Sequence, residues 1–125
     1  VPGMRERRWG RGVAITSIAA RQASPGLILS STARAGVTGF LRTLATQVAR
    51  DGVTVNSLQP GLHATDRLRV LHGDDLGPVA AVVPTGELGR PEDFGRVAAF
   101  LCSDAARFVT GSALLVDGGA YQGLQ

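Results

Sequence analysis

Residues 51–61, Asp-Gly-Val-Thr-Val-Asn-Ser-Leu-Gln-Pro-Gly, decide the fold of this chain. Asp51-Gly52 is typical of a helix end, because glycine takes the left-handed capping conformation at little cost. Residues 53–58 then predict a short buried strand, and Pro60-Gly61 ends it, since proline has no N–H for a strand ladder. The segment therefore predicts a helix that leads directly into a strand.

The segments on both sides repeat this alternation. Upstream, residues 12–17 predict a short strand, and Ser24-Pro25 predicts the start of a helix over residues 25–50. Downstream, residues 89–93 open another helix and residues 113–116 predict a third strand. This order of elements is typical of an α/β protein in which parallel strands are joined by right-handed crossovers.

The sequence predicts a further feature in each of two segments. Residues 62–88 are mixed in composition and contain several Gly and Pro, so we expect an excursion that holds one short helix. The helix over 25–50 carries four small residues in its middle: Ala33, Ala35, Gly36 and Gly39. Glycine inside a helix costs about 1 kcal/mol relative to alanine, so we expect a neighbour packed closely against that face.

Composition narrows the class of protein. The chain has 125 residues, 44% hydrophobic and 18% charged, which predicts one folded domain over residues 1–125. It contains no lysine, which excludes a Schiff-base or P-loop lysine within it. The single cysteine, Cys102, excludes an internal disulfide, and its position on an apolar helix face predicts a packing role. No stretch approaches ~18 apolar residues, and the first residues lack the apolar run of a signal peptide, so we expect a cytoplasmic protein without membrane association.

The charged residues and the histidines do not indicate a nucleic-acid-binding site or a metal site. Arg5, Arg7, Arg8 and Arg11 cluster near the start, which suits either a nucleic-acid patch or a solvated helix end. We favour the solvated end, because Trp9 is the only aromatic residue nearby and aromatic residues make up 5% of the chain. The two histidines of the excursion, His63 and His72, lack the neighbouring ligands of a metal site, so we expect surface histidines and no bound metal.

An ordered series of short motifs carries a family resemblance. The series is Ile15-Thr16-Ser17, Ser30-x-x-x-Arg34, Val55-Asn56, Pro60-Gly61-x-x-x-Thr65, Gly89-Arg90-Pro91-Glu92-Asp93, Ala98-Ala99-Phe100-Leu101, Ser103-Asp104, Thr110-Gly111 and Val116-Asp117-Gly118-Gly119. In this order the motifs resemble the short-chain dehydrogenase/reductase family, in its 3-oxoacyl-carrier-protein reductase-like branch. The resemblance implies the C-terminal half of a Rossmann-like, doubly wound parallel sheet, with three parallel strands and flanking helices.

The chain departs from the family pattern in two respects. It has no Gly-rich dinucleotide loop, so we expect a partial domain that lacks the N-terminal, dinucleotide-binding half, as in a fragment or truncated product. At the positions of the family's catalytic Tyr-x-x-x-Lys it has Ser30 and Arg34. A phenol with a pKa of about 10 exchanges a proton far more readily than an aliphatic hydroxyl, which usually needs an adjacent base. Arg34 cannot be that base, but its donors suit ribose hydroxyls.

The resemblance assigns roles to the remaining candidate residues. Ser17 matches the substrate-orienting serine, although its hydroxyl would equally suit a cap at the strand end. Pro60-Gly61 would shape the wall beside the nicotinamide, the alternative being a plain turn. Thr65 would bond the carboxamide. The expected site thus has catalytic Ser17, Ser30 and Arg34, and cofactor-binding Arg34, Pro60, Gly61 and Thr65.

The function implied is that of an NAD(P)-dependent oxidoreductase, which transfers hydride between NAD or NADP and a carbonyl/alcohol or acyl thioester substrate. Without the Tyr/Lys pair and the Gly-rich loop, we expect this chain to be weakly active or inactive. The alternative is a non-catalytic module that forms homo-oligomers, because the family pairs subunits through the helix matching 25–50 and through the C-terminal helix and strand. Residues 62–88 would match the substrate lid.

Overall fold

Three parallel strands form the centre of the computed structural model, which describes residues 1–124. They are β1 (Gly10–Ile15), β2 (Val53–Pro60) and β3 (Ala113–Val116), in the spatial order β1-β2-β3. Register runs from Gly10 opposite Val53 to Ile15 opposite Leu58, and β3 pairs with the last four residues of β2. The predicted three-stranded parallel sheet is confirmed, with β1 beginning two residues earlier than expected.

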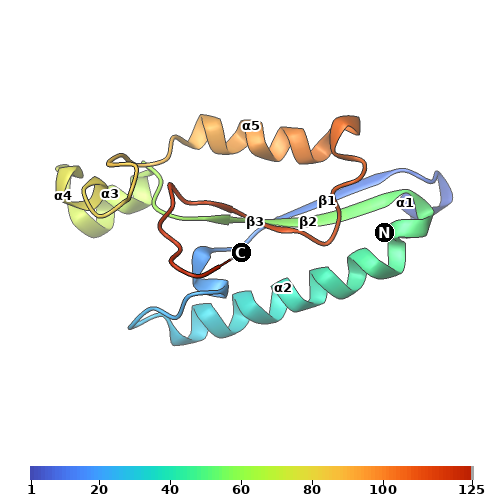
Figure 1. The fold of residues 1–125 in the computed structure, drawn as a ribbon, viewed down its shortest axis with the longest axis horizontal. Coiled ribbons are helices and arrows are strands. Elements are labelled where there is room, and N and C mark those ends of the chain that lie inside the picture. The colour runs from blue at the N-terminus through green and yellow to red at the C-terminus, as the bar shows by residue number, and fades with distance from the viewer. Residues whose placement is uncertain (125) are drawn as a thin grey trace.

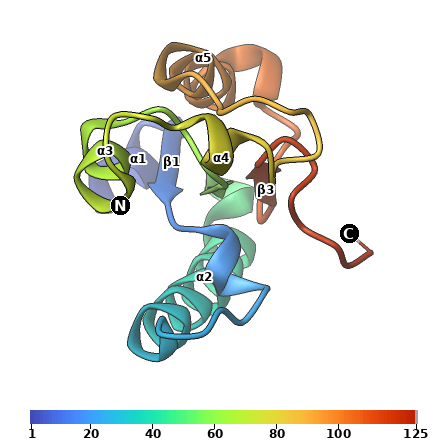
Figure 2. The ribbon, with the colours of Figure 1, turned by 90° about the vertical axis from the view of Figure 1, so that its left-hand side faces the viewer.

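One long helix covers each face of the sheet. Helix α2 (Ile28–Val48) lies along one face and α5 (Pro91–Cys102) along the other, as Figures 1 and 2 show. Because side chains alternate along a strand, β2 contributes to two separate cores. The α2 side holds Ala45, Val48, Val53 and Val55, and the α5 side holds Leu58, Leu101 and Ala106.

Helix α2 begins later than the sequence predicts. Ser24-Pro25 forms a turn instead, in which the Leu27 N–H donates to the Ser24 carbonyl oxygen at 3.1 Å. Gly26 has a φ of 78°, a left-handed conformation that interrupts helical geometry. The prediction of a start at residue 25 was therefore wrong, because a capping Ser-Pro pair is followed by a glycine that reverses the chain.

The predicted helix end is confirmed. After α2 the chain makes a short 3₁₀ turn, Ala49–Asp51, and Gly52 caps it with a φ of 73°. A Cβ at Gly52 would collide with the carbonyl oxygen of Arg8, so glycine is required there by packing as well as by conformation. This close approach brings the segment before β1 against the start of β2.

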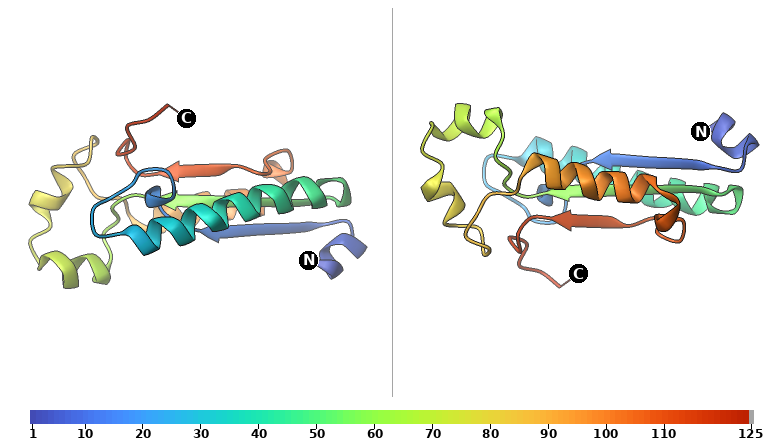
Figure 3. Two further views of the ribbon diagram at one scale, coloured as in Figure 1. Left: turned by 90° about the horizontal axis from the view of Figure 1, so that it is seen from below. Right: turned by 90° about the horizontal axis from the view of Figure 1, so that it is seen from above.

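The remaining elements are short. They are α1 (Pro2–Glu6), the 3₁₀ turns η1 (Ile18–Ala20) and η3 (Asp104–Ala106), and two helices in the excursion, α3 (Asp66–His72) and α4 (Gly77–Ala80). The excursion thus holds two short helices where one was expected, and it lies beyond the carboxyl ends of the strands (Figure 3). Among residues 1–124, no helix has the length and apolar character needed to cross a membrane.

One expectation about a helix face was wrong. Cys102 is exposed at the end of α5 and does not contribute to the core, because helical periodicity identifies an apolar face without showing what covers it. A Cβ added at Gly36 or Gly39 would meet no neighbour within 4 Å, so no other part of the described chain lies against these two glycines. The close packing expected on this face of α2 therefore stays a prediction.

Candidate functional site at the carboxyl edge of the sheet

The carboxyl ends of β1 and β2 border a pocket of about 340 Å³. Pro60, Gly61 and Thr65, the three residues expected beside a nicotinamide, all line it. Helix α3 closes one side with the buried Leu68, and Phe94 of α5 lies on another. The structure therefore brings the Pro-Gly turn and the threonine that follows it into one wall, and the excursion supplies the cover.

A second pocket of about 360 Å³ adjoins the first. Its lining includes Thr16 from the end of β1 and both Ser30 and Arg34 from the first turns of α2. Ile15, which is 63% exposed, lines both pockets. The candidate residues on α2 therefore lie near those that follow β2, because the two pockets share Ile15.

Arg34 ties α2 to the end of β1. Its Nη1 donates to the Thr16 carbonyl oxygen at 2.5 Å, and its Nε donates to the Ser30 hydroxyl oxygen at 3.1 Å. The predicted arrangement of Ser30 and Arg34 on one helix face is therefore present. The Nη2 donors of Arg34 have no partner among residues 1–124 and remain available to a ligand.

Ser17 lies just beyond β1 and does not line either pocket. Its Oγ accepts a hydrogen bond from the Ala19 N–H at 3.1 Å and caps the turn η1. This is the capping arrangement that the sequence left open as an alternative. Because the oxygen acts here as an acceptor, the O–H of Ser17 is still able to donate to another group.

The Pro60-Gly61 turn is fixed by the neighbouring strand. The Gly61 N–H donates to the Val116 carbonyl oxygen at 3.0 Å, and a Cβ on Gly61 would lie 2.8 Å from the Cα of Asp117. Glycine is required there because the chains after β2 and β3 approach so closely. Thr65 begins α3, and its Oγ1 accepts from the Leu68 N–H at 3.4 Å, which again leaves an O–H to donate.

His63 belongs to this site, although the sequence predicted a surface histidine. Its ring packs edge-on against Phe94, with centroids 5.1 Å apart, and its Nδ1 lies 3.3 Å from the Gly61 carbonyl oxygen. The ring covers Gly89, where a Cβ would fall 2.5 Å from it. Only the parallel bridge between His63 and Gly89 creates this packing, and nothing in the local sequence signals it.

The chemistry available at this edge is hydrogen-bond donation. None of the residues that line the Ser30 pocket is a carboxylate or an imidazole, so Ser30 has no adjacent general base there. Within residues 1–124, no group of three His, Cys, Asp or Glu side chains is arranged to hold a metal ion. Hydroxyl and guanidinium donors at the ends of two parallel strands suit the oxygen atoms of a substrate or cofactor.

Known proteins match the chain over nearly its whole length. The family model described as enoyl-(acyl carrier protein) reductase matches residues 1–121. The acetoacetyl-CoA reductase of Cupriavidus necator is 39% identical over 98% of this chain and 50% of its own length. The 3-oxoacyl-(acyl-carrier-protein) reductase of Haemophilus influenzae is 41% identical over 94% of this chain and 49% of its own.

Solved structures agree with these relatives. YwfH, an NADPH-dependent reductase involved in bacilysin biosynthesis, superposes with a TM-score of 0.91 and 26% identity, over 97% of this chain and 50% of that one. The chain therefore spans about half the length of these two curated relatives and of the solved YwfH structure.

Proposed function

The chain belongs to the short-chain dehydrogenase/reductase family, and from that premise we propose that it forms the substrate-facing part of an NAD(P)-dependent oxidoreductase. The observation that carries the proposal is the position of Arg34. Its guanidinium bonds both Ser30 and the end of β1, in a pocket next to the one that Pro60, Gly61 and Thr65 line.

The residues present fit one end of a nicotinamide cofactor. Arg34 keeps Nη2 donors for ribose hydroxyls, and the Thr65 O–H is available to a carboxamide oxygen. The sequence has no Gly-x-x-x-Gly-x-Gly turn, so the proposal assigns no residue of this chain to the adenosine end. The cofactor, when bound, supplies the hydride that is exchanged with the substrate carbon. NAD and NADP both satisfy the donors described.

The side chains would hold and polarise a substrate oxygen. The hydroxyl oxygens of Ser17 and Ser30 accept hydrogen bonds from the Ala19 N–H and the Arg34 guanidinium respectively, so each O–H is left to donate. Such donors stabilise the negative charge that develops on a carbonyl oxygen during reduction. The reduced oxygen must then gain a proton. No carboxyl or imidazole group lines the Ser30 pocket to supply it, so we expect turnover to be slow or undetectable.

A carbonyl, alcohol or acyl thioester is the substrate class we propose. The names of the two curated relatives support it, because both describe reductases that act on acyl groups carried as thioesters. The lining of the pocket beside Pro60, Gly61 and Thr65 is mainly apolar, which suits an acyl chain. We also propose that the protein is cytoplasmic.

Cofactor titration tests the proposal. We expect NADPH or NADH fluorescence to change saturably on addition of the protein, and Arg34→Gln to weaken binding about tenfold by removing charged donors. Arg69→Gln is the matched control, because Arg69 pairs with the exposed Asp66 on α3. Equal affinities for the wild type and Arg34→Gln would contradict the assignment.

An activity assay complements the titration. We expect NADPH consumption with acyl thioester and ketone substrates to be close to background for the wild type. Turnover at the level of an ordinary reductase, abolished by Ser30→Ala, would contradict the expectation of a weak site.

A non-catalytic, oligomerising module is the second candidate, and the exposed side of α2 favours it. Ile28, Leu29 and Phe40 are exposed there, beside Gly36 and Gly39, which meet no neighbour. Phe100 of α5 and Leu114 of β3 are exposed as well, on the elements that the sequence analysis assigned to a second interface. An apolar, small-residue helix face of this kind suits close packing against a second copy.

Light scattering at micromolar concentration tests the oligomer. We expect a dimer or larger species, and Phe40→Arg should shift it towards monomer because a buried charge at an apolar interface is costly. Val82→Arg, at an exposed apolar position of the excursion and away from α2, is the control. A monomeric wild type would exclude this second candidate without affecting cofactor titration.

A further inference from the structure

A pocket of about 670 Å³ opens at the amino edge of the sheet, at the opposite ends of the strands from the candidate site. Its volume lies within the range of about 300–1,000 Å³ typical of small-molecule sites. Arg8 and Trp9 precede β1, Thr54 lies on β2, and Arg107 and Phe108 follow η3. Three segments that are distant in sequence thus converge there.

The inner wall of this pocket carries a buried hydroxyl without a partner. Thr54 is 5% exposed, and its Oγ1 has no hydrogen-bond partner among residues 1–124. The alternation along β2 directs Thr54 to the α5 side of the sheet, together with Leu58. Less than 1 Å² of that oxygen is accessible, so Thr54 forms part of the pocket wall while the groups that can bond a ligand come from other lining residues.

Arginine side chains make the same pocket positive. Arg107 has no hydrogen-bond or ion-pair partner for its guanidinium among the described residues. Arg8 donates one Nη2 hydrogen bond to the Arg50 carbonyl oxygen, at 2.7 Å, and keeps its other donors. The acid on the lining, Asp104, already accepts from Trp9 and Arg11. The donors of Arg8 and Arg107 are therefore available to an anion.

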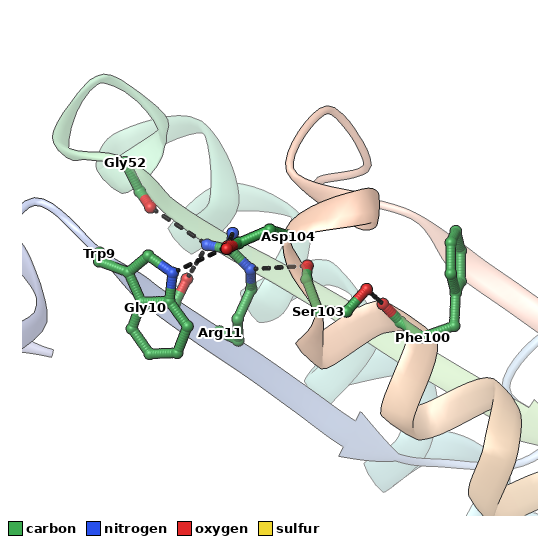
Figure 4. Close-up of polar contacts among 7 residues, drawn as sticks. All are labelled: Trp9, Gly10, Arg11, Gly52, Phe100, Ser103 and Asp104. Carbon is green, nitrogen blue, oxygen red and sulfur yellow. Dashed lines mark hydrogen bonds and ion pairs between the residues drawn. The ribbon is translucent and has the colours of Figure 1, made fainter.

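Aromatic rings complete the lining. Figure 4 shows how the Trp9 indole is held: its Nε1 donates to Asp104 at 3.1 Å, and the Arg11 guanidinium lies 5.0 Å from the ring centroid. Phe108 is 99% exposed on the other segment. A ring fixed by polar contacts is a preorganised stacking surface, because little side-chain freedom is lost when a ligand binds.

We propose that this pocket binds a nucleoside monophosphate. A phosphate group offers three strong acceptor oxygens, which match the free donors of the Arg8 and Arg107 guanidinium groups. The base stacks on Trp9 or Phe108, as bases do on exposed aromatic side chains. The site is independent of the nicotinamide site proposed above, because the two lie at opposite ends of the strands.

Trp9 is the only tryptophan in the chain, so its fluorescence reports on this pocket alone. We expect AMP to quench it saturably, and adenosine and inorganic phosphate each to bind at least about tenfold more weakly, since each lacks one of the two recognised groups. No saturable quenching by AMP would overturn the proposal. So would equal affinities for AMP and adenosine, because the arginines would then contribute nothing.

Three variants locate the response. Arg107→Gln should weaken AMP binding about tenfold, whereas Arg90→Gln, an exposed arginine near the opposite edge, should leave it unchanged. Loss of the response in Arg34→Gln would place the nucleotide at the carboxyl edge and overturn the proposal.

Discussion

The two ends of the sheet each depend on one arginine, and the two arginines are used differently. At the amino edge the Arg11 side chain is 6% exposed and donates to Gly10, Gly52, Ser103 and Asp104 (Figure 4). At the carboxyl edge Arg34 is half-buried and donates to Thr16 and Ser30 only. The comparison shows that the hydrogen bonds of Arg11 hold the fold together, while Arg34 keeps donors for a ligand.

Arg11 joins segments that the chain separates widely. The Arg11 Nε donates to the Ser103 carbonyl oxygen at 3.3 Å, and Nη1 donates to Gly10 at 2.9 Å and to Gly52 at 3.4 Å. These carbonyl groups belong to the starts of β1 and β2 and to the end of α5. Its Nη2 reaches Asp104 at 3.1 Å, and that carboxylate is well exposed, so the carbonyl contacts carry most of the stabilisation.

The largest effect is expected from Arg11→Met, which keeps an apolar stem and removes the guanidinium. We expect the free energy of unfolding to fall by about 2–4 kcal/mol, because two part-buried carbonyl groups and one exposed carbonyl group lose a charged donor together. Urea denaturation measures it. Arg69→Met, in a pair with an exposed aspartate, should cost no more than about 0.5 kcal/mol. Equal losses in the free energy of unfolding of the two variants would contradict a stabilising role for Arg11.

Gly61→Ala should have the next largest effect. The new Cβ would lie 2.8 Å from the Cα of Asp117, so the turns after β2 and β3 must separate. We expect a loss of about 1–3 kcal/mol, the usual cost of overpacking, together with weaker NADPH binding. Thermal unfolding and cofactor titration on the same sample measure both. A stable variant that binds NADPH normally would show that this edge does not require the close approach.

Arg34→Met sharpens the comparison between the two arginines directly. It removes donors to Thr16 and Ser30 from a half-buried position, so we expect a loss of about 1 kcal/mol in the free energy of unfolding. Its effect on NADPH affinity should exceed its effect on stability, in contrast to Arg11→Met. Urea denaturation measures the loss of stability. If Arg34→Met lost more stability than Arg11→Met, the conclusion that Arg11 mainly stabilises the fold and Arg34 mainly serves a ligand would be wrong.

Gly95→Ala should have the smallest effect, and of opposite sign. Gly95 lies within α5, and a Cβ there meets no atom within 4 Å. Replacing an exposed helical glycine by alanine removes backbone freedom from the unfolded chain, so we expect a gain of about 0.5–1 kcal/mol. The urea midpoint checks it. A destabilised Gly95→Ala would indicate that this side of α5 is covered by another surface in solution.

The sequence predicted correctly those helix ends and strands that are determined by residues close to them in the chain. Gly52 ends the helix before β2, and residues 113–116 form β3 as expected, because a left-handed cap and an apolar run act over a few residues. The start of α2 was wrong, because Gly26 overrides the preceding Ser-Pro signal. The pairing of Ser30 with Arg34 follows from helical spacing, and the structure shows that pair bonded.

The sequence by itself determined the order of the elements, the parallel sheet and the positions of Ser30, Arg34, Pro60, Gly61 and Thr65 relative to the elements that carry them. The elements follow from periodicity and turn chemistry, which are local, and the candidate residues follow from the family resemblance of their motifs. Only the tertiary structure decided that His63 packs against Phe94, that Arg11 is buried, and that Thr54 lines a pocket without a partner. Those outcomes depend on contacts between segments that are far apart along the chain. The geometry of the whole sheet determines which of these groups meet, and the residues next to them in sequence do not.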